Sequence, residues 1–192
     1  RDRENPRHIR TDALPRFRNV ALIYADEAEN ISISGKGTID GNGTRFVKPK
    51  EGDNWTGWWY ERIVPNEESV PRVVFLAGCR NISITDVTMT NQPSGWSYWI
   101  HDCDNVHFEG CRIMADVHYP NNDGIHINSS RDVTIAGCHI ETGDDSVVIR
   151  ANNRSLREDK VCERVSVRDC YFRSWSSGVR IGWTNDGIIR NC

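Results

Sequence analysis

The segment PNNDGIHINSSRDVTIAGCHIETGDDSVVI, residues 120–149, combines short alternating stretches with turns that carry acidic residues. Asp123 lies in NNDG, and Asp144 and Asp145 lie side by side in TGDD. Between them, DVTIAG alternates apolar and polar residues with the period of two that indicates a β-strand. The segment therefore predicts short strands that start beside aspartates, and the repeat to which it belongs decides the fold.

The alternating strand at residues 130–140 is one copy of an internal repeat. Similar segments, each with a polar residue before a β-branched stretch, occupy residues 28–39, 79–89, 103–113 and 162–172, and residues 187–192 resemble the start of another. Further short strands lie between the copies, with almost no helical pattern. Several strands per repeat predict an all-β solenoid of stacked coils, a parallel β-helix. The 51 residues from Ile31 to Ile82 leave room for two coils and an insertion.

We expect residues 1–192 to form a single β-helix domain. The chain stops within a repeat strand, and a solenoid needs a capping end. The sequence therefore predicts truncation at the C-terminal end and leaves truncation at the N-terminal end open. An uncovered end would favour association between copies, although the oligomeric state is not predicted.

Composition excludes several classes of protein. The net charge of −3 and the pI near 6.1 lack the basic signature of a nucleic-acid-binding protein. No apolar run approaches the roughly 18 residues of a membrane span, and residues 1–10 do not resemble a signal peptide. The seven cysteines show no zinc-like spacing and fall at the beginning or end of the repeat strands. They are expected either to stack as small interior side chains or to form disulfides.

Aligning three stretches, DGIHIN, DSVVIR and SGVRIG, predicts which side chains share a column. Ile125, Val147 and Val179 are expected to point inward, whereas side chains at the alternate positions point outward. The outward set contains His126, Val148 and Arg180 in one column and Asn128, Arg150 and Gly182 in the next.

The same alignment places Asp123 over Asp145, with Asp144 beside both. Adjacent strands are about 4.8 Å apart, so the three carboxylates repel one another and at least one pKa should be raised. A protonated acid beside ionised carboxylates is the pair that glycoside hydrolysis requires. Two other uses of these aspartates stay open, namely turn capping and calcium binding.

The two acidic sequences resemble the motifs of glycoside hydrolase family 28, the polygalacturonase-like right-handed parallel β-helices. NNDG (121–124) is similar to the family's N-T-D-G motif and GDD (143–145) to its G/Q-D-D motif, and GKGTIDGNG (35–43) and the Trp-rich NWTGWW (54–59) also resemble the family. The resemblance implies a secreted or periplasmic hydrolase that cleaves pectin-like or other acidic polysaccharides with inversion. No cofactor, metal, nucleic acid or membrane partner is implied.

The resemblance also implies roles for the aspartates. Asp144 would be the general acid, and Asp123 and Asp145 would hold and activate the water. Inverting enzymes usually keep acid and base roughly 6.5–9.5 Å apart. Asp123 and Asp145 should therefore each lie farther from the reacting oxygen of Asp144 than from one another.

The chain departs from the family pattern at two places. Ser177, in SSG, stands where the family's G-H-G motif has its His. RIG at 180–182 comes too early for the family's R-I-K motif and lacks its Lys, and the expected truncation would account for the missing motif. We expect other residues to supply charge, hydrogen bonds or stacking to the substrate. This predicted substrate-binding set is His118, His126, Arg150, Arg180 and Trp183. The departures keep two alternatives open: a non-catalytic carbohydrate-binding β-helix, and a β-helix hydrolase with a different glycan specificity.

Overall fold

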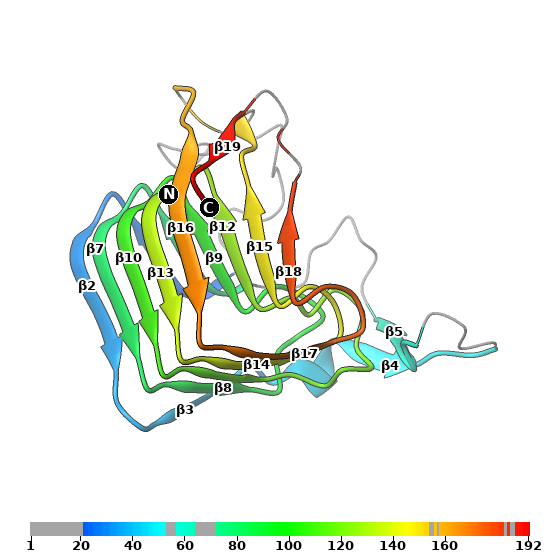
Figure 1. The fold of residues 1–192 in the computed structure, drawn as a ribbon. Helices are drawn as coiled ribbons and strands as arrows, with labels where there is room; N and C mark the ends of the chain where they lie inside the picture. Colours follow the sequence, from blue (N-terminus) through cyan, green and yellow to red (C-terminus); the bar gives the residue numbers. More distant parts are fainter. Residues whose placement is uncertain are drawn as a thin grey trace, which may run out of the picture.

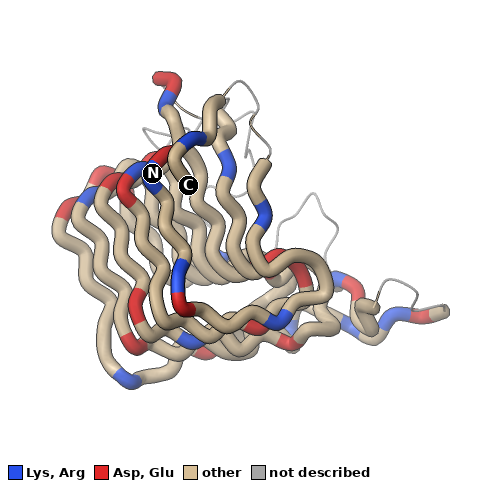
Figure 2. The backbone as a smooth tube through the Cα atoms, viewed as in Figure 1, with Lys and Arg blue, Asp and Glu red and all other residues tan. Residues whose placement is uncertain are grey.

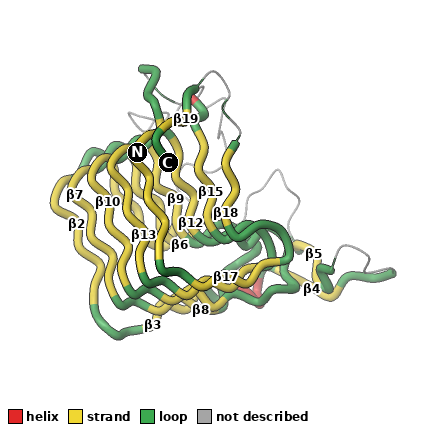
Figure 3. The backbone as a smooth tube through the Cα atoms, viewed as in Figure 1, coloured by secondary structure: helices red, strands yellow, loops and turns green. Residues whose placement is uncertain are grey.

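The computed structural model describes residues 21–52, 57–63, 72–153, 156, 158–182, 184 and 187–192. In these residues, three parallel sheets wind into one stack of coils (Figure 1). This is the all-β parallel β-helix expected from the repeat, with the right-handed winding that the family resemblance implies. Strands and turns make up nearly all of the described chain, and none of its helices could span a membrane (Figure 3).

Each coil contributes one strand to each sheet. The first sheet contains β1 (Ala21–Asp26), β6 (Arg72–Ala77), β9 (Tyr98–His101), β12 (Ile125–Asn128), β15 (Val147–Arg150) and β18 (Val179–Ile181). The second sheet contains β2 (Glu29–Ser34), β7 (Arg80–Thr85), β10 (Asp104–Glu109), β13 (Arg131–Ala136), β16 (Cys162–Arg168) and β19 (Ile189–Arg190). The third sheet contains β3 (Thr38–Asp40), β8 (Thr88–Thr90), β11 (Arg112–Met114), β14 (His139–Thr142) and β17 (Tyr171–Ser174).

The interior of the stack is filled by every second side chain of each strand. Ile125 pairs with Val147, and Val147 pairs with Val179, which confirms the predicted inward column. Ile125 and Val147 are fully buried, but Val179 is 41% exposed. The difference arises because, in the described part of the chain, β18 has a neighbouring strand on one side only.

The cysteines take the stacked interior positions. Five of the seven are buried, Cys170 is partly buried, and all seven are free thiols in the structure. Ser130 occupies the same column as Cys103, and its Oγ accepts a hydrogen bond from the Cys103 backbone N–H at 3.0 Å. Small side chains therefore stack through this part of the core, which is the first of the two arrangements expected for the cysteines; the other was disulfide formation.

Charge alternates along the stack at the beginning of the second-sheet strands. The paired positions in stack order are Glu29, Arg80, Asp104, Arg131, Glu163 and Arg190. Arg190 Nε lies 2.6 Å from Glu163 Oε2. Figure 2 shows charged residues concentrated at the turns, whereas the strands are mostly uncharged. Since opposed like charges destabilise a strand pair, this alternation favours the observed register.

The prediction of two coils and an insertion between Ile31 and Ile82 is wrong. These residues pair directly on adjacent strands, so one coil holds all the extra length. The insertion includes a 3₁₀ turn, η1 (Gly43–Arg45), and an antiparallel hairpin of β4 (Val47–Pro49) and β5 (Tyr60–Arg62). Figure 1 shows this hairpin outside the stack, beside the turns that lead from the third sheet to the first.

Candidate active site

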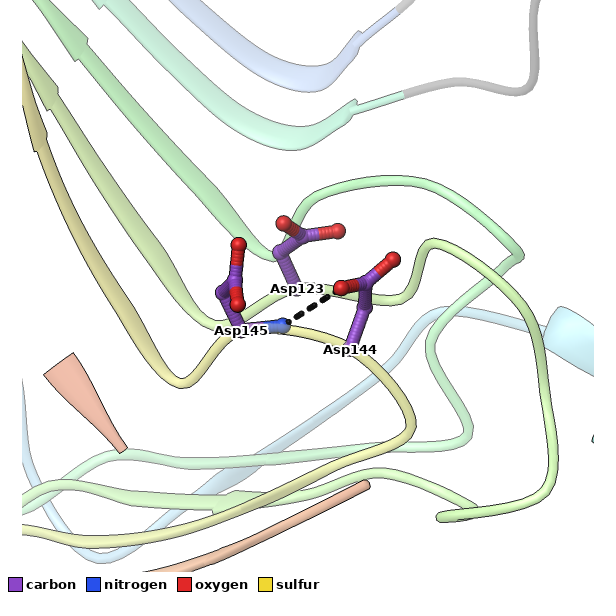
Figure 4. Close-up of side chains that lie close together, drawn as sticks. All are labelled: Asp123, Asp144 and Asp145. Atoms are coloured by element: carbon purple, nitrogen blue, oxygen red, sulfur yellow. Dashed lines mark hydrogen bonds between the residues drawn. The ribbon is translucent and has the colours of Figure 1, made fainter. Parts of the chain in front are cut away.

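The three predicted aspartates come together at the turns from the third sheet to the first (Figure 4). Asp123 lies just before β12, and Asp144 and Asp145 lie just before β15, one coil further along. One carboxylate oxygen from each aspartate lies within 4.8 Å of the other two. These nearest oxygens are closer together than the roughly 6.5–9.5 Å usual between the acid and base of an inverting enzyme. The expected order of the three separations stays a prediction.

Two glycines and an asparagine allow the turns to pack this closely. The Gly143 N–H donates to Oδ1 of the buried Asn122 at 2.6 Å. A Cβ on Gly143 would collide with the Tyr119 carbonyl oxygen, and one on Gly124 would collide with that of Ser146. The glycines of NNDG and GDD are therefore needed for close backbone approach.

Burial and mutual repulsion change the acidity of two of the carboxyl groups. Burial raises the pKa of Asp123 to about 7, with a further increase from Asp145, while the nearby Arg72 opposes the shift. Burial also raises the pKa of Asp144 to about 7, and both other aspartates add to it. The expectation that at least one pKa is raised is confirmed, and a carboxyl group with such a pKa can exchange a proton near neutral pH.

The Asp123 carboxyl group is in hydrogen-bond contact with the His126 imidazole. Its Nε2 lies 2.8 Å from Asp123 Oδ2, and its ring stacks on Trp96 with 3.6 Å between centroids. The side chain points away from the interior of the stack, as predicted, but it is fully buried rather than exposed. Burial, together with Arg150 and Arg72, holds the pKa of His126 well below its usual value. A neutral imidazole can donate to the ionised Asp123 carboxylate from this position, in the tautomer that carries the proton on Nε2.

Asp145 and Asp144 are held by other donors. Arg180 Nη1 donates to Asp145 Oδ2 at 3.0 Å, and Ser176 Oγ donates to Asp145 Oδ1 at 2.8 Å. Asn121 Nδ2 donates to Asp144 Oδ2 at 3.2 Å. The structure thus assigns a contact to Arg180, while Ser176, rather than its neighbour Ser177 at the family's His position, reaches the aspartates.

Three residues outside the predicted substrate-binding set extend the site, namely Arg62, Arg72 and Trp96. The Arg72 guanidinium lies over the Trp96 ring at 4.2 Å, and Arg150 approaches the same ring at 5.5 Å. Arg62 comes from the hairpin, and the charges of Asp123 and Asp144 both act on it. The predicted residue Arg150 therefore belongs to a cationic group around Trp96 that no local spacing in the sequence revealed.

The remaining predicted substrate-binding residues have different outcomes. His118 contacts the hairpin rather than the aspartates, with its ring stacked on Trp59 at a centroid distance of 3.8 Å. Trp183 lies outside the described residues.

The aspartates are close enough together to consider one cation. Ca²⁺ takes about six to eight oxygen ligands. Here Arg180 and His126 already direct N–H donors at two of the three carboxylates. The donor set therefore suits carboxylates that are balanced by protein cations better than a calcium site.

Together, these features define a parallel β-helix with an acid–base cluster of aspartates on its outer side. The chain belongs to the glycosyl hydrolases family 28, whose family model matches residues 15–173.

Known proteins that resemble the chain are longer. A polygalacturonase from Medicago sativa is 28% identical over 83% of this chain and 41% of its own length. An endo-polygalacturonase from Pectobacterium carotovorum subsp. carotovorum is 30% identical over 68% of the chain and 32% of its own length. The family 28 exopolygalacturonase structure from Yersinia enterocolitica superposes with a TM-score of 0.58 at 19% identity, over 75% of this chain and 31% of that one. The chain thus spans less than half of each of these relatives.

Proposed function

We propose that this chain hydrolyses glycosidic bonds in a pectin-like, acidic polysaccharide by an inverting acid–base reaction. The observation that carries the proposal is the aspartate cluster, in which burial raises the pKa values of Asp123 and Asp144 to about 7. Membership of the hydrolase family and the polygalacturonase relatives support the same reaction class.

Asp144 is the proposed general acid. Its raised pKa keeps a proton available near neutral pH for transfer to the departing glycosidic oxygen. Asp123 and Asp145 are proposed to hold the attacking water. Asp123 Oδ1 is buried and has no hydrogen-bond partner among the described residues, so it can accept a hydrogen bond from a water molecule.

An anionic substrate is supported by the charge of the surrounding residues. The aspartates are surrounded by four arginines that interact electrostatically with them or with one another: Arg62, Arg72, Arg150 and Arg180. Burial lowers the pKa of Arg72 to about 9, with Arg62 and Arg150 adding to the effect, so this group remains charged at neutral pH. The cationic side chains at the site outnumber the anionic ones, and this excess of positive charge favours binding of a glycan that contains negatively charged uronate units. Because such polymers lie outside cells, we also propose secretion or export to the periplasm.

Release of reducing ends from polygalacturonate and a panel of neutral glycans tests the proposal. The parent chain should release them from polygalacturonate, and Asp144→Asn should lose about 10²–10⁴-fold in kcat. Asp169→Asn, at an exposed turn away from the cluster, is the matched control and should keep full activity. Retained polysaccharide binding without turnover would overturn hydrolysis in favour of a carbohydrate-binding β-helix. Release from a neutral glycan alone would overturn the acidic substrate.

A further inference from the structure

Two tryptophans near the aspartates are exposed, unlike the buried Trp99 of the first sheet. Trp59 is 53% exposed and Trp175 is 54% exposed. Trp59 stacks on His118 with the two rings 8° from parallel, so one face of its indole is covered. The His118 ring also lies 6.1 Å from Trp175, between centroids. His118 therefore links two aromatic rings that come from distant parts of the sequence.

The position of Trp175 is fixed relative to the proposed catalytic groups. Ser174 Oγ donates to the Asp144 carbonyl oxygen at 2.6 Å, and Ser176 Oγ donates to the Asp145 carboxylate. Trp175 thus lies between two residues that contact the cluster directly. Its ring also packs against the Gly57 backbone, where an added Cβ would approach ring atoms to 2.9 Å.

The hairpin brings Trp59 to the same place. Trp58 Nε1 donates to the Gly143 carbonyl oxygen at 2.6 Å, one residue before Asp144. The Trp59 backbone N–H donates to the His118 carbonyl oxygen at 3.1 Å, and its carbonyl oxygen accepts from Lys50 N–H at 2.9 Å. Both aromatic rings are therefore held in position without a ligand, which lowers the entropic cost of binding one.

We propose that Trp59, His118 and Trp175 form an aromatic platform that binds a sugar ring of the polysaccharide on the leaving-group side of the cleaved bond. The platform adjoins Asp144, the proposed proton donor to the leaving group, whereas Trp96 and His126 lie under Asp123. A pyranose has an apolar C–H face that matches an exposed indole, and aromatic rings beside polar groups are typical of ligand sites. The His118 ring is nearly parallel to that of Trp59 and tilted by 47° from that of Trp175, so the two indoles offer separate faces to the sugar. This inference rests on the proposed hydrolase function.

Binding of galacturonate oligosaccharides of two to six units to the inactive Asp144→Asn chain tests the platform, for example by isothermal titration calorimetry. Trp59→Ala and Trp175→Ala in that background should each weaken binding of the longer oligosaccharides by about three- to tenfold. Trp59→Phe should lose less, because a smaller ring remains. Tyr171→Ala is the matched control: Tyr171 is 55% exposed and packs against a histidine, His139, but not beside the cluster.

The outcomes separate the platform from the proposed function. Unchanged affinity in both Trp→Ala variants, or equal loss in Tyr171→Ala, would overturn the platform while leaving the hydrolase proposal intact. If Asp144→Asn bound none of the oligosaccharides, the acidic substrate and the platform would both be wrong. Thermal melts that match the parent would show that lost affinity does not come from unfolding.

Discussion

Nε2 of His126 lies 2.8 Å from Oδ2 of Asp123, and both side chains are buried. The Trp96 ring stacks on the imidazole of His126, and the Arg72 guanidinium lies over the Trp96 ring. The pKa of the imidazole is held well below its usual value, so the neutral ring contacts Asp123 through a hydrogen bond rather than as a counter-ion. His126 lies on the same coil as Asp123, whereas the His of the family's G-H-G motif corresponds to Ser177, two coils further along.

Replacing His126 should move the acidic limb of the pH profile. In His126→Leu the ionised form of Asp123 loses a donor, so the pKa of Asp123 should rise further above its ordinary value and the limb should move to higher pH. His126→Gln keeps an N–H donor and should shift the limb less. The measurement is kcat/KM against pH for both variants. Profiles that coincide with the parent's would show that His126 does not position or tune Asp123.

Asparagine in the cluster should increase stability at alkaline pH while removing activity. The folded-state pKa of Asp144 is raised to about 7 from 3.8, so the folded state binds this proton more tightly than the unfolded state. Its favourable contribution is complete below about pH 4 and is lost as pH rises through 7. At pH 8 the free energy of unfolding of Asp144→Asn, measured in urea, should therefore exceed that of the parent by on the order of 1–3 kcal/mol. The difference should be smaller at pH 4.

The control for that stability change is Asp169→Asn, which alters an exposed carboxylate paired with Arg168. The free energy of unfolding of Asp169→Asn should differ from that of the parent by a similar amount at pH 8 and at pH 4. If Asp144→Asn were less stable than the parent at pH 8, burial and repulsion within the cluster would not disfavour the ionised form of Asp144 as the raised pKa requires.

The column alignment in the first sheet could be predicted because it depends on local pattern. The strict period of two fixes which side chains of DGIHIN and DSVVIR face inward, and equal register then places Asp123 one strand from Asp145. The burial of His126 could not be predicted in this way. Alternation shows that its side chain leaves the stack, but not that Trp96 covers it.

The hairpin was beyond the reach of the repeat pattern. The 51 residues from Ile31 to Ile82 predicted two coils and an insertion, whereas the structure has one coil with a longer insertion, because a solenoid sequence offers no local signal that distinguishes a coil from an insertion. Arg62 and Trp59 enter the site through contacts with residues far along the chain, Ser94 and His118. The sequence therefore predicted the carboxylates and missed most of the groups that surround them.

Gly124→Ala should destabilise the fold because its Cβ would collide with the Ser146 carbonyl oxygen on the next coil. We expect a loss of about 1–3 kcal/mol in the free energy of unfolding, measured in urea. Gly37→Ala is the matched control: nothing lies within 4 Å of an added Cβ there, and its stability should change little. Equal stability of the two variants would show that the turns of the cluster can separate without cost.

Chelation should leave hydrolysis unchanged. Arg180 Nη1 lies 3.0 Å from Asp145 Oδ2, in a position from which it opposes a divalent cation at the same carboxylate. Activity on polygalacturonate should be equal after dialysis against EDTA and after addition of millimolar Ca²⁺. Loss with EDTA that Ca²⁺ restores would assign the aspartates to a metal site instead.

The anomer released first should have the inverted configuration, although one oxygen from each aspartate lies within 4.8 Å of the others. These nearest oxygens are closer together than the roughly 6.5–9.5 Å usual between the acid and base of inverting enzymes, so the stereochemistry is a sharp test of the proposed reaction. Inversion is expected because Asp123, held by His126, and Asp145, held by Arg180 and Ser176, are proposed to bind the attacking water. Proton NMR of the first turnovers distinguishes the two outcomes. A retained configuration would show that an aspartate attacks the sugar directly, and it would remove the water-activating role proposed for Asp123 and Asp145.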